Sequence, residues 1–337
     1  MTGHTTDKGA LIKECLKRFP KTPTATLAKK IYAENPEMFT TVETVRASIR
    51  FYRGKTGGVL RDKITDRRFI EEEDRPRNPF AALPDGIKYF NEWAPVQLPE
   101  AKTLVIGDLH VPYHDRESML LALEYGYKEN VRAILLLGDI IDFYGTSKWE
   151  TDPRRRDLWK EIETGREVLR VIRSGFPNAA FRAKQGNHDE RYMRYLWFKA
   201  PELLNVPDFQ YAKFMHFAEH GVELIEDRRI LRIGGLHLIH GHEFGRMFGD
   251  PVNPARGIYN RGKAHCLCAH WHRTSQHSET SMDGKTISCW SVGCVCDLHP
   301  EYMPINKWNH GFAIVENLGG DDEFLVHNHT VVKGKAY

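Results

Sequence analysis

Apolar residues recur at intervals of three and four positions in the first 60 residues, and this spacing predicts helices. The pattern predicts three of them, over residues 11–19, 24–34 and 42–53. Thr40 and Glu43 have the spacing of a capping box before the third helix, and Gly54 marks its end. The front of the chain, residues 1–60, is therefore predicted to be a small all-α domain.

From residue 101 onward the pattern changes to short runs of aliphatic and β-branched residues, separated by stretches with helical spacing. Such alternation predicts an α/β domain over residues 101–337. Residues 61–100 mix charge and proline without a sustained period, so we expect a linker there.

Polar clusters follow five of the predicted strands directly. They are Asp108 and His110, Asp139 and Asp142, Asn187 and His188, His240 and His242, and His270 and His272. In open α/β sheets the carboxyl ends of strands are the usual place for a site. Two residues spaced by one in an extended segment also point to the same side, so each D-x-H or H-x-H pair can face one ion.

These clusters supply carboxylates, imidazoles and one amide oxygen. Such ligands favour manganese, with iron, zinc and magnesium as alternatives. Because there are too many ligands for one tetrahedral ion, we expect two divalent metals about 3.5–4 Å apart with a shared carboxylate. Cys266 and Cys268 have a spacing that is unusual for zinc, and we expect them to be buried strand residues.

The blocks GDLH, GDIID, GNHD, HGH and AHWH, in that order, resemble the motifs of the calcineurin-like metallophosphoesterase superfamily over residues 101–337. The resemblance implies a four-layer α-β-β-α sandwich, preceded here by the helical domain. It also implies two metal-binding sets. They are Asp108, His110, Asp139 and His272 for the first ion, and Asp139, Asn187, His240 and His270 for the second.

The same resemblance makes His188 the catalytic histidine, oriented by Asp142, while metal-bound hydroxide attacks phosphorus. A carboxylate partner would favour the imidazolium form of His188. Ala269 stands where the family usually has glycine, and we expect little effect because this residue is not a ligand. His242 is expected either to support a ligand or to contact substrate.

The stretch GDIIDFYG lacks the arginine with which phosphoprotein phosphatases of this superfamily clamp a terminal phosphate. Without a bidentate cation a monoester dianion binds poorly, so phosphodiesters are favoured. The sequence leaves open whether an arginine comes from elsewhere. The candidates are Arg154 to Arg156, Arg182, Arg191 and Arg273.

Charge is unevenly distributed along the chain. The formal net charge is +3, yet residues 1–63 hold 13 Lys and Arg against 6 Asp and Glu, a net charge of +7. Arg46, Arg50 and Arg53 recur at helical spacing on the third helix. This layout resembles a helix-turn-helix module, although the connection ENPEMFT is longer than the usual turn, and it predicts binding of nucleic acid.

The sequence thus predicts a metal-dependent phosphodiesterase that acts on nucleic acid. A phosphodiesterase or phosphatase for small molecules such as cyclic nucleotides is one alternative, and an inactive nucleic-acid-binding protein is another. No apolar run approaches the roughly 18 residues of a membrane span, and the N-terminus lacks a signal-peptide pattern. We therefore expect a soluble cytoplasmic protein without a membrane partner.

Overall fold

The computed structural model describes residues 7–54, 80, 82–87, 93–245, 252–320 and 323–337. The chain divides into two compact units, Met1–Tyr89 and Phe90–Tyr337. Most of the predicted linker, 61–100, lies outside the described residues. None of the described helices is both long and apolar enough to cross a membrane.

The first unit contains three helices, α1 (Asp7–Arg18), α2 (Thr24–Glu34) and α3 (Val42–Tyr52). Its core is formed by fully buried aliphatic side chains from all three, among them Leu16, Leu27 and Ile49. All three predicted helices are present, although α1 begins at Asp7 instead of residue 11 and the cap of α3 differs from the predicted one. Thr41, rather than Thr40, caps it, because the Thr41 hydroxyl accepts the Thr44 N–H at 3.2 Å.

The three arginines of α3 and its C-cap do not form one exposed row. Arg50 is exposed, and Arg46 forms an ion pair with Glu43 at 3.3 Å. Arg53, by contrast, donates to Thr24 Oγ1 at 2.9 Å and to two backbone carbonyls of the preceding loop. Its guanidinium therefore links α3 to the start of α2, which revises the prediction that Arg53 faces a polyanion.

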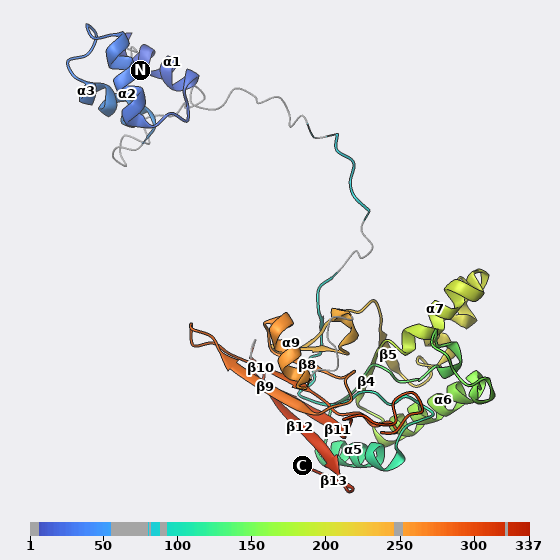
Figure 1. Ribbon diagram of the computed structural model, residues 1–337. Coiled ribbons are helices and arrows are strands. Elements are labelled where there is room, and N and C mark those ends of the chain that lie inside the picture. The colour runs from blue at the N-terminus through green and yellow to red at the C-terminus, as the bar shows by residue number, and fades with distance from the viewer. Residues whose placement is uncertain (1–6, 55–79, 81, 88–92, 246–251, 321–322) are drawn as a thin grey trace. The chain divides into compact units, whose positions relative to one another are not determined.

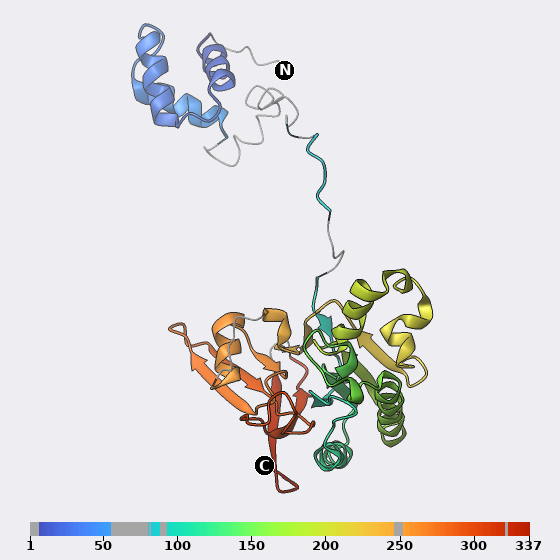
Figure 2. The ribbon, with the colours of Figure 1, turned by 45° about the vertical axis from the view of Figure 1, so that its right-hand side comes forward.

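The second unit contains two β-sheets, which lie against each other (Figures 1 and 2). The seven-stranded sheet runs in the order β13 (Lys335–Ala336), β12 (Phe324–Val332), β11 (His310–Asn317), β2 (Lys102–Ile106), β3 (Ala133–Leu137), β4 (Ala180–Lys184) and β5 (Val222–Ile225). Strands β2 to β5 are parallel, and β11 to β13 pair antiparallel.

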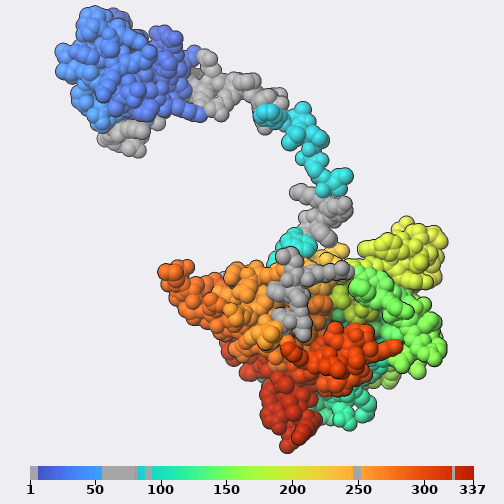
Figure 3. All heavy atoms as spheres, viewed as in Figure 1, coloured from blue at the N-terminus to red at the C-terminus, as the bar shows by residue number. Residues whose placement is uncertain are grey.

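The six-stranded sheet runs in the order β1 (Val96–Gln97), β6 (Leu231–Ile233), β7 (Leu236–Ile239), β8 (Cys266–Cys268), β10 (Thr286–Ser291) and β9 (Ser275–Thr280). Strand β1 pairs with β6, so the end of the predicted linker is part of this sheet. In the space-filling view, the C-terminal part of the chain, which is orange to red and contributes strands to both sheets, covers one side of the unit (Figure 3). The green and yellow segments cover the other side.

Helices cover the outer faces of both sheets. They are α5 (Arg116–Lys128), α6 (Leu158–Gly175), α7 (Asp189–Lys199), the short α8 (Tyr211–Phe214) and α9 (Pro254–Gly262). Short 3-10 turns connect them, namely η1 (Tyr144–Thr146), η2 (Pro153–Arg155), η3 (Pro201–Leu203), η4 (Pro207–Phe209) and η5 (His242–Phe244).

Alternate residues of the central strands enter different cores. On β3, Ile134 and Leu136 join the cluster packed with α5 and α6, whereas Leu135 and Leu137 join the cluster between the two sheets. Because both of its faces are covered, β3 is apolar throughout. On the outer face of the second sheet, the cysteines of β8 pack with α9 as free thiols. The predicted four-layer α-β-β-α sandwich and the buried strand cysteines are therefore confirmed.

Candidate metal centre

Five polar loops leave the carboxyl ends of β2, β3, β4, β7 and β8, and they converge. The loops after β2 to β4 come from the parallel part of one sheet, and those after β7 and β8 come from a parallel pair in the other. Several groups of ligand atoms from these loops lie within 4.8 Å of one another. The structure thus brings together residues that are up to 164 positions apart in the chain.

The first predicted set has its ligand atoms turned toward one point. His110 Nε2 lies 3.2 Å from His272 Nε2 and 3.7 Å from Asp139 Oδ2. Asp108 Oδ1 lies 3.3 Å from His272 Nε2. Because the Nδ1–H of His110 donates to Asp142 Oδ1 at 2.8 Å, its Nε2 lone pair is free to bind a cation.

The second predicted set meets the first at Asp139. Asp139 Oδ2 lies 3.2 Å from His240 Nε2, which is also 3.2 Å from Asn187 Oδ1. His270 offers a ring nitrogen within 4.8 Å of the ligand atoms of Asp139 and His240. The Nδ1–H of His240 donates to the Leu137 carbonyl at 2.8 Å, which again leaves Nε2 facing the site. Asp139 is therefore the carboxylate placed between the two sets.

Several of these residues have left-handed backbone conformations, which non-glycine residues rarely adopt. Asp108, His110, Asp139, His270 and His272 have φ angles between 48° and 72°. Each such residue costs on the order of 1–3 kcal/mol. The left-handed conformation turns each side chain away from the direction of its strand and toward the common point. The packing of the two sheets holds these backbone conformations in place.

Two small residues make room for the converging loops. Gly138 has φ +90°, and a Cβ there would lie 2.3 Å from His240 Nδ1. A Cβ on Gly107 would lie 2.5 Å from the Cβ of Ala269, which is fully buried. Ala269 is accommodated because its neighbour Gly107 has no side chain.

The electrostatics of the site suit bound cations. Asp108 and Asp139 are fully buried, and the Oδ1 atom of Asp108 has no hydrogen-bond partner among the described residues. Burial lowers the pKa of His240, but Asp139 and Asp108 raise it to about 10. The two carboxylates therefore require positive charge beside them, and a pair of divalent cations fits this arrangement of oxygen and imidazole atoms.

His188 lies at the edge of the ligand cluster. Its Nδ1 is 2.9 Å from Asp142 Oδ1, the same oxygen that contacts His110, and its Nε2 is 2.7 Å from Arg191 Nη2. A guanidinium can only donate, so Nε2 accepts and Nδ1–H donates to Asp142. One oxygen of Asp142 therefore holds the rings of both His188 and His110 in place.

The charge of His188 differs from the sequence expectation. Burial lowers its pKa, with further contributions from His110 and Arg191, and these effects outweigh the attraction of Asp139 and Asp142. Together with the hydrogen bond that Nε2 accepts from Arg191, this lowered pKa favours the neutral imidazole, in contrast to the imidazolium that the sequence predicted. Arg191, one of several arginines that the sequence left open, carries the positive charge beside Asp142.

The other candidate arginines have different partners. Arg154 pairs with Asp152 at 2.7 Å, and Arg155 pairs with Glu301 at 2.8 Å. Arg156 and Arg273 donate to loop oxygens, and Arg182 pairs with Glu100 and Glu223 at 2.8 Å each.

Sequence reasoning missed an acid that holds two of the loops together. The Asp189 carboxylate is fully buried and accepts the backbone N–H groups of Ile140 and Gly186 at 3.1 and 2.8 Å, together with the hydroxyl of Tyr211 at 2.8 Å. It therefore fixes the GDIID and GNHD loops relative to each other. Asp189 is the last residue of the GNHD block, so the motif pointed to it, but the motif does not show which groups its carboxylate would accept hydrogen bonds from.

A second missed group supports the loop that carries His240. Glu243 accepts the backbone N–H of His240 at 3.0 Å and pairs with fully buried Lys184 at 2.9 Å. Burial raises the pKa of Glu243, but Lys184 and His242 bring it down to about 2. The Nε2–H of His242 donates to the Glu190 carboxylate at 2.9 Å, so its contacts here are with the protein.

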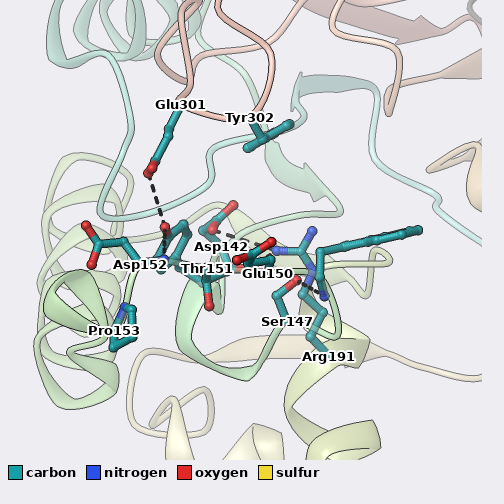
Figure 4. Close-up of a pocket in the computed structure, with 11 residues that line it drawn as sticks. Asp142, Ser147, Glu150, Thr151, Asp152, Pro153, Arg191, Glu301 and Tyr302 are labelled. Carbon is teal, nitrogen blue, oxygen red and sulfur yellow. Dashed lines mark hydrogen bonds and ion pairs between the residues drawn. The ribbon is translucent and has the colours of Figure 1, made fainter.

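Two cavities open beside His188 and His110. The larger, about 750 Å³, is lined by Asp142 and Arg191 together with the loop that includes Ser147 and Glu150 (Figure 4). The smaller is about 400 Å³ and is lined by His110 and Asp142. Asp142, Tyr144, Glu301 and Tyr302 line both, so the two cavities adjoin.

Comparisons with known proteins give a limited result. No family model matches the chain, and no curated protein sequence matches it. Among solved structures, Vacuolar Protein Sorting 29 from Cryptosporidium parvum is 15% identical with a TM-score of 0.38, covering 71% of this chain and 95% of that one. The phosphoesterase YfcE from E. coli is 14% identical with a TM-score of 0.33, covering 66% of this chain and 96% of that one.

The nuclease MPE from Pseudomonas putida is 11% identical with a TM-score of 0.29, covering 67% of this chain and 87% of that one. At these values the likeness says nothing about what this chain acts on. The five motifs and the convergence of their side chains are the features that indicate a metal centre here.

Proposed function

We propose that the second unit, with the motifs and four-layer fold of a calcineurin-like metallophosphoesterase, is a dinuclear-metal phosphodiesterase that acts on nucleic acid. The observation that carries the proposal is the position of Asp139 Oδ2, 3.7 Å from His110 Nε2 and 3.2 Å from His240 Nε2. A carboxylate placed between two sets of ligands suits a pair of cations. Such a pair acidifies water and screens the charge of phosphoryl oxygens.

The chain's own residues would divide the remaining work. Asp142 holds His188 in one tautomer, with Nε2 directed toward Arg191. When a phosphate enters, the Arg191 guanidinium can donate to its oxygens instead of to His188 Nε2. Nε2 can then take up a proton from solvent and donate it to the leaving oxygen. The backbone N–H of His188 donates to Asp139 Oδ1 at 2.7 Å and so holds the shared carboxylate.

Two features favour diesters over monoesters. Arg191 is a single guanidinium, which matches the single negative charge of a diester better than the dianion of a monoester. The two cavities also adjoin, because they share lining residues, and Asp142 is one of these. A diester has two groups attached to phosphorus, and each cavity offers room for one of them.

The test is a panel of esters offered to the protein reconstituted with Mn, Fe, Zn or Mg. We expect cleavage of oligonucleotides and of bis-p-nitrophenyl phosphate, and slower cleavage of p-nitrophenyl phosphate. Turnover of small diesters or cyclic nucleotides without any oligonucleotide cleavage would favour the small-molecule alternative. Tight nucleic-acid binding without hydrolysis under any metal would favour the inactive binding protein.

We also propose that the basic helical unit binds the polymer and raises its concentration near the site. Replacing exposed Arg50 with glutamate in the full chain is expected to weaken binding of DNA and RNA. The slope of log K against log salt should fall by roughly 1–2, since one phosphate contact is lost and a repulsive charge is added. Fluorescence anisotropy at several salt concentrations measures both quantities.

The matched control is Arg170→Glu, which reverses the charge of an exposed arginine on α6 of the second unit. It is expected to bind nucleic acid as the unmodified protein does. Equal effects of the two substitutions would contradict a specific role for the helical unit.

A further inference from the structure

The smaller cavity beside the metal centre has an aromatic lining. Tyr113, Tyr144, Tyr302 and Trp308 all line it, together with His110 of the first metal-binding set. A substrate group in this cavity would therefore lie next to the ion that His110 helps to hold. Neither the metal-binding sets nor the roles of His188 and Arg191 account for this collection of rings.

The rings continue outward from the metal-binding set. The Trp308 ring lies 4.0 Å from the His272 ring, and the Tyr302 ring lies 6.3 Å from Trp308. On another side of the cavity, Tyr113 and Tyr144 are 6.1 Å apart. Tyr302 is 58% exposed and Tyr113 is 39% exposed, so both present ring surface to an incoming group.

The charges of this cavity do not suit a phosphate. Its guanidinium, Arg155, is already paired with Glu301 at 2.8 Å. Asp297 also lines the cavity and adds a negative charge. The occupant is therefore expected to be an uncharged, flat part of the substrate, and aromatic side chains stack on the faces of such rings.

We propose that the smaller cavity binds one unpaired nucleobase adjacent to the scissile phosphate, so that the substrate is single-stranded nucleic acid. This inference rests on the proposed function. A cavity of about 400 Å³ has room for one nucleoside but not for a base pair with both of its sugars. A base in a duplex would first have to leave its stack, whereas a single strand offers its bases directly.

Stacking on aromatic rings is tolerant of sequence, because every base has a π-face. The cavity is therefore expected to select single-stranded over double-stranded substrates, without preferring a particular base. The larger cavity, which Arg191 lines, leaves room for the group on the other side of the phosphorus.

The experiment uses the full-length protein loaded with the metal that gives the fastest turnover. Its probes are a dinucleoside phosphate and two analogues, each lacking the base on one side of the phosphate. We expect kcat/KM to fall roughly 5- to 100-fold when the base that occupies the cavity is removed, and to change little for the other analogue. An oligonucleotide should also be cleaved faster alone than when annealed to its complement.

Variants then locate the effect. Tyr302→Ala is expected to lower kcat/KM for the dinucleoside phosphate. The ratio of this kcat/KM to that of the analogue without the cavity-bound base should then be close to one. Tyr302→Phe keeps the ring and should keep the ratio. Tyr127→Ala removes an exposed tyrosine of α5 that does not line the cavity and should behave as the unmodified protein.

The outcomes separate this inference from the proposed function. Cleavage of all three diesters at equal rates, or faster cleavage of the duplex, would overturn the nucleobase site while the phosphodiesterase stands. If no diester is cleaved with any metal, the proposed function fails and the inference fails with it. A Tyr302→Ala variant that keeps the full ratio would show that the base binds elsewhere.

Discussion

Replacing Asp139 with asparagine is expected to abolish both metal retention and turnover. The Oδ2 atom of Asp139 lies between His110 Nε2 and His240 Nε2, so both ions would lose the same anionic ligand. An amide is neutral and would direct either a weaker oxygen or an N–H toward the cations. Metal analysis of the purified variant, together with turnover of bis-p-nitrophenyl phosphate, measures both losses.

A matched control is available in Asp157, which caps α6 by accepting the Lys160 N–H at 3.0 Å. Asp157→Asn keeps a good capping residue, so this variant should retain two equivalents of metal and normal turnover. If Asp139→Asn also retained two equivalents, Asp139 would not be the shared ligand. The dinuclear proposal would then need a different bridge.

Replacing His188 with alanine should have the opposite pattern, with metals retained and rate lost. The imidazole contacts Asp142 and Arg191 and lies 4.0 Å from Asp139 Oδ2, whereas the hydrogen bond to Asp139 is made by the backbone N–H of His188, which alanine keeps. We expect kcat to fall by roughly 10²- to 10⁴-fold, the usual contribution of a positioned acid or base. Metal content and kcat are measured on the same preparation.

The choice of substrate distinguishes two roles for His188. If its imidazole assists the departing oxygen, the loss should be larger for an alkoxide leaving group than for p-nitrophenolate, which leaves readily without a proton. Equal losses would indicate that His188 acts on the phosphoryl oxygens instead. His327→Ala, which removes a half-exposed histidine of β12, serves as the control and should change neither metal content nor rate. Loss of metal from His188→Ala would contradict the assigned role.

Local patterns predicted the elements of the fold because each helix or strand buries one face or both. The apolar spacing in residues 24–34 matches α2, and the run before GDIID matches β3. Where the prediction differed, a long-range contact was responsible. Val96 and Gln97 look like linker residues, yet they pair with β6, a strand more than 130 residues later.

The charges within the site could not be predicted in the same way. The resemblance of the motifs implies that Asp142 orients His188, and from that pair alone an imidazolium is the natural expectation. Burial, His110 and Arg191 reverse the expectation by lowering the pKa of His188. A pKa depends on all the neighbours of a group, and most of these neighbours come from other loops.

Arg53 and Glu243 illustrate the same limit. Helical spacing placed Arg53 among the exposed arginines, but its guanidinium joins α3 to Thr24 of α2 and to the loop before α2. Glu243 has no motif of its own, and its function of holding the His240 loop is visible only beside Lys184.

The amino-acid sequence by itself determined the α/β class of the second unit, the helices of the first and the residue types at the strand ends, because burial periodicity and the D-x-H and H-x-H spacings are local properties of the chain. Only the tertiary structure decided which arginine faces His188, which acids hold the loops together and what lines the cavities beside them. These features join residues from different loops and both sheets, and the distances between such residues are set by how the sheets pack against each other.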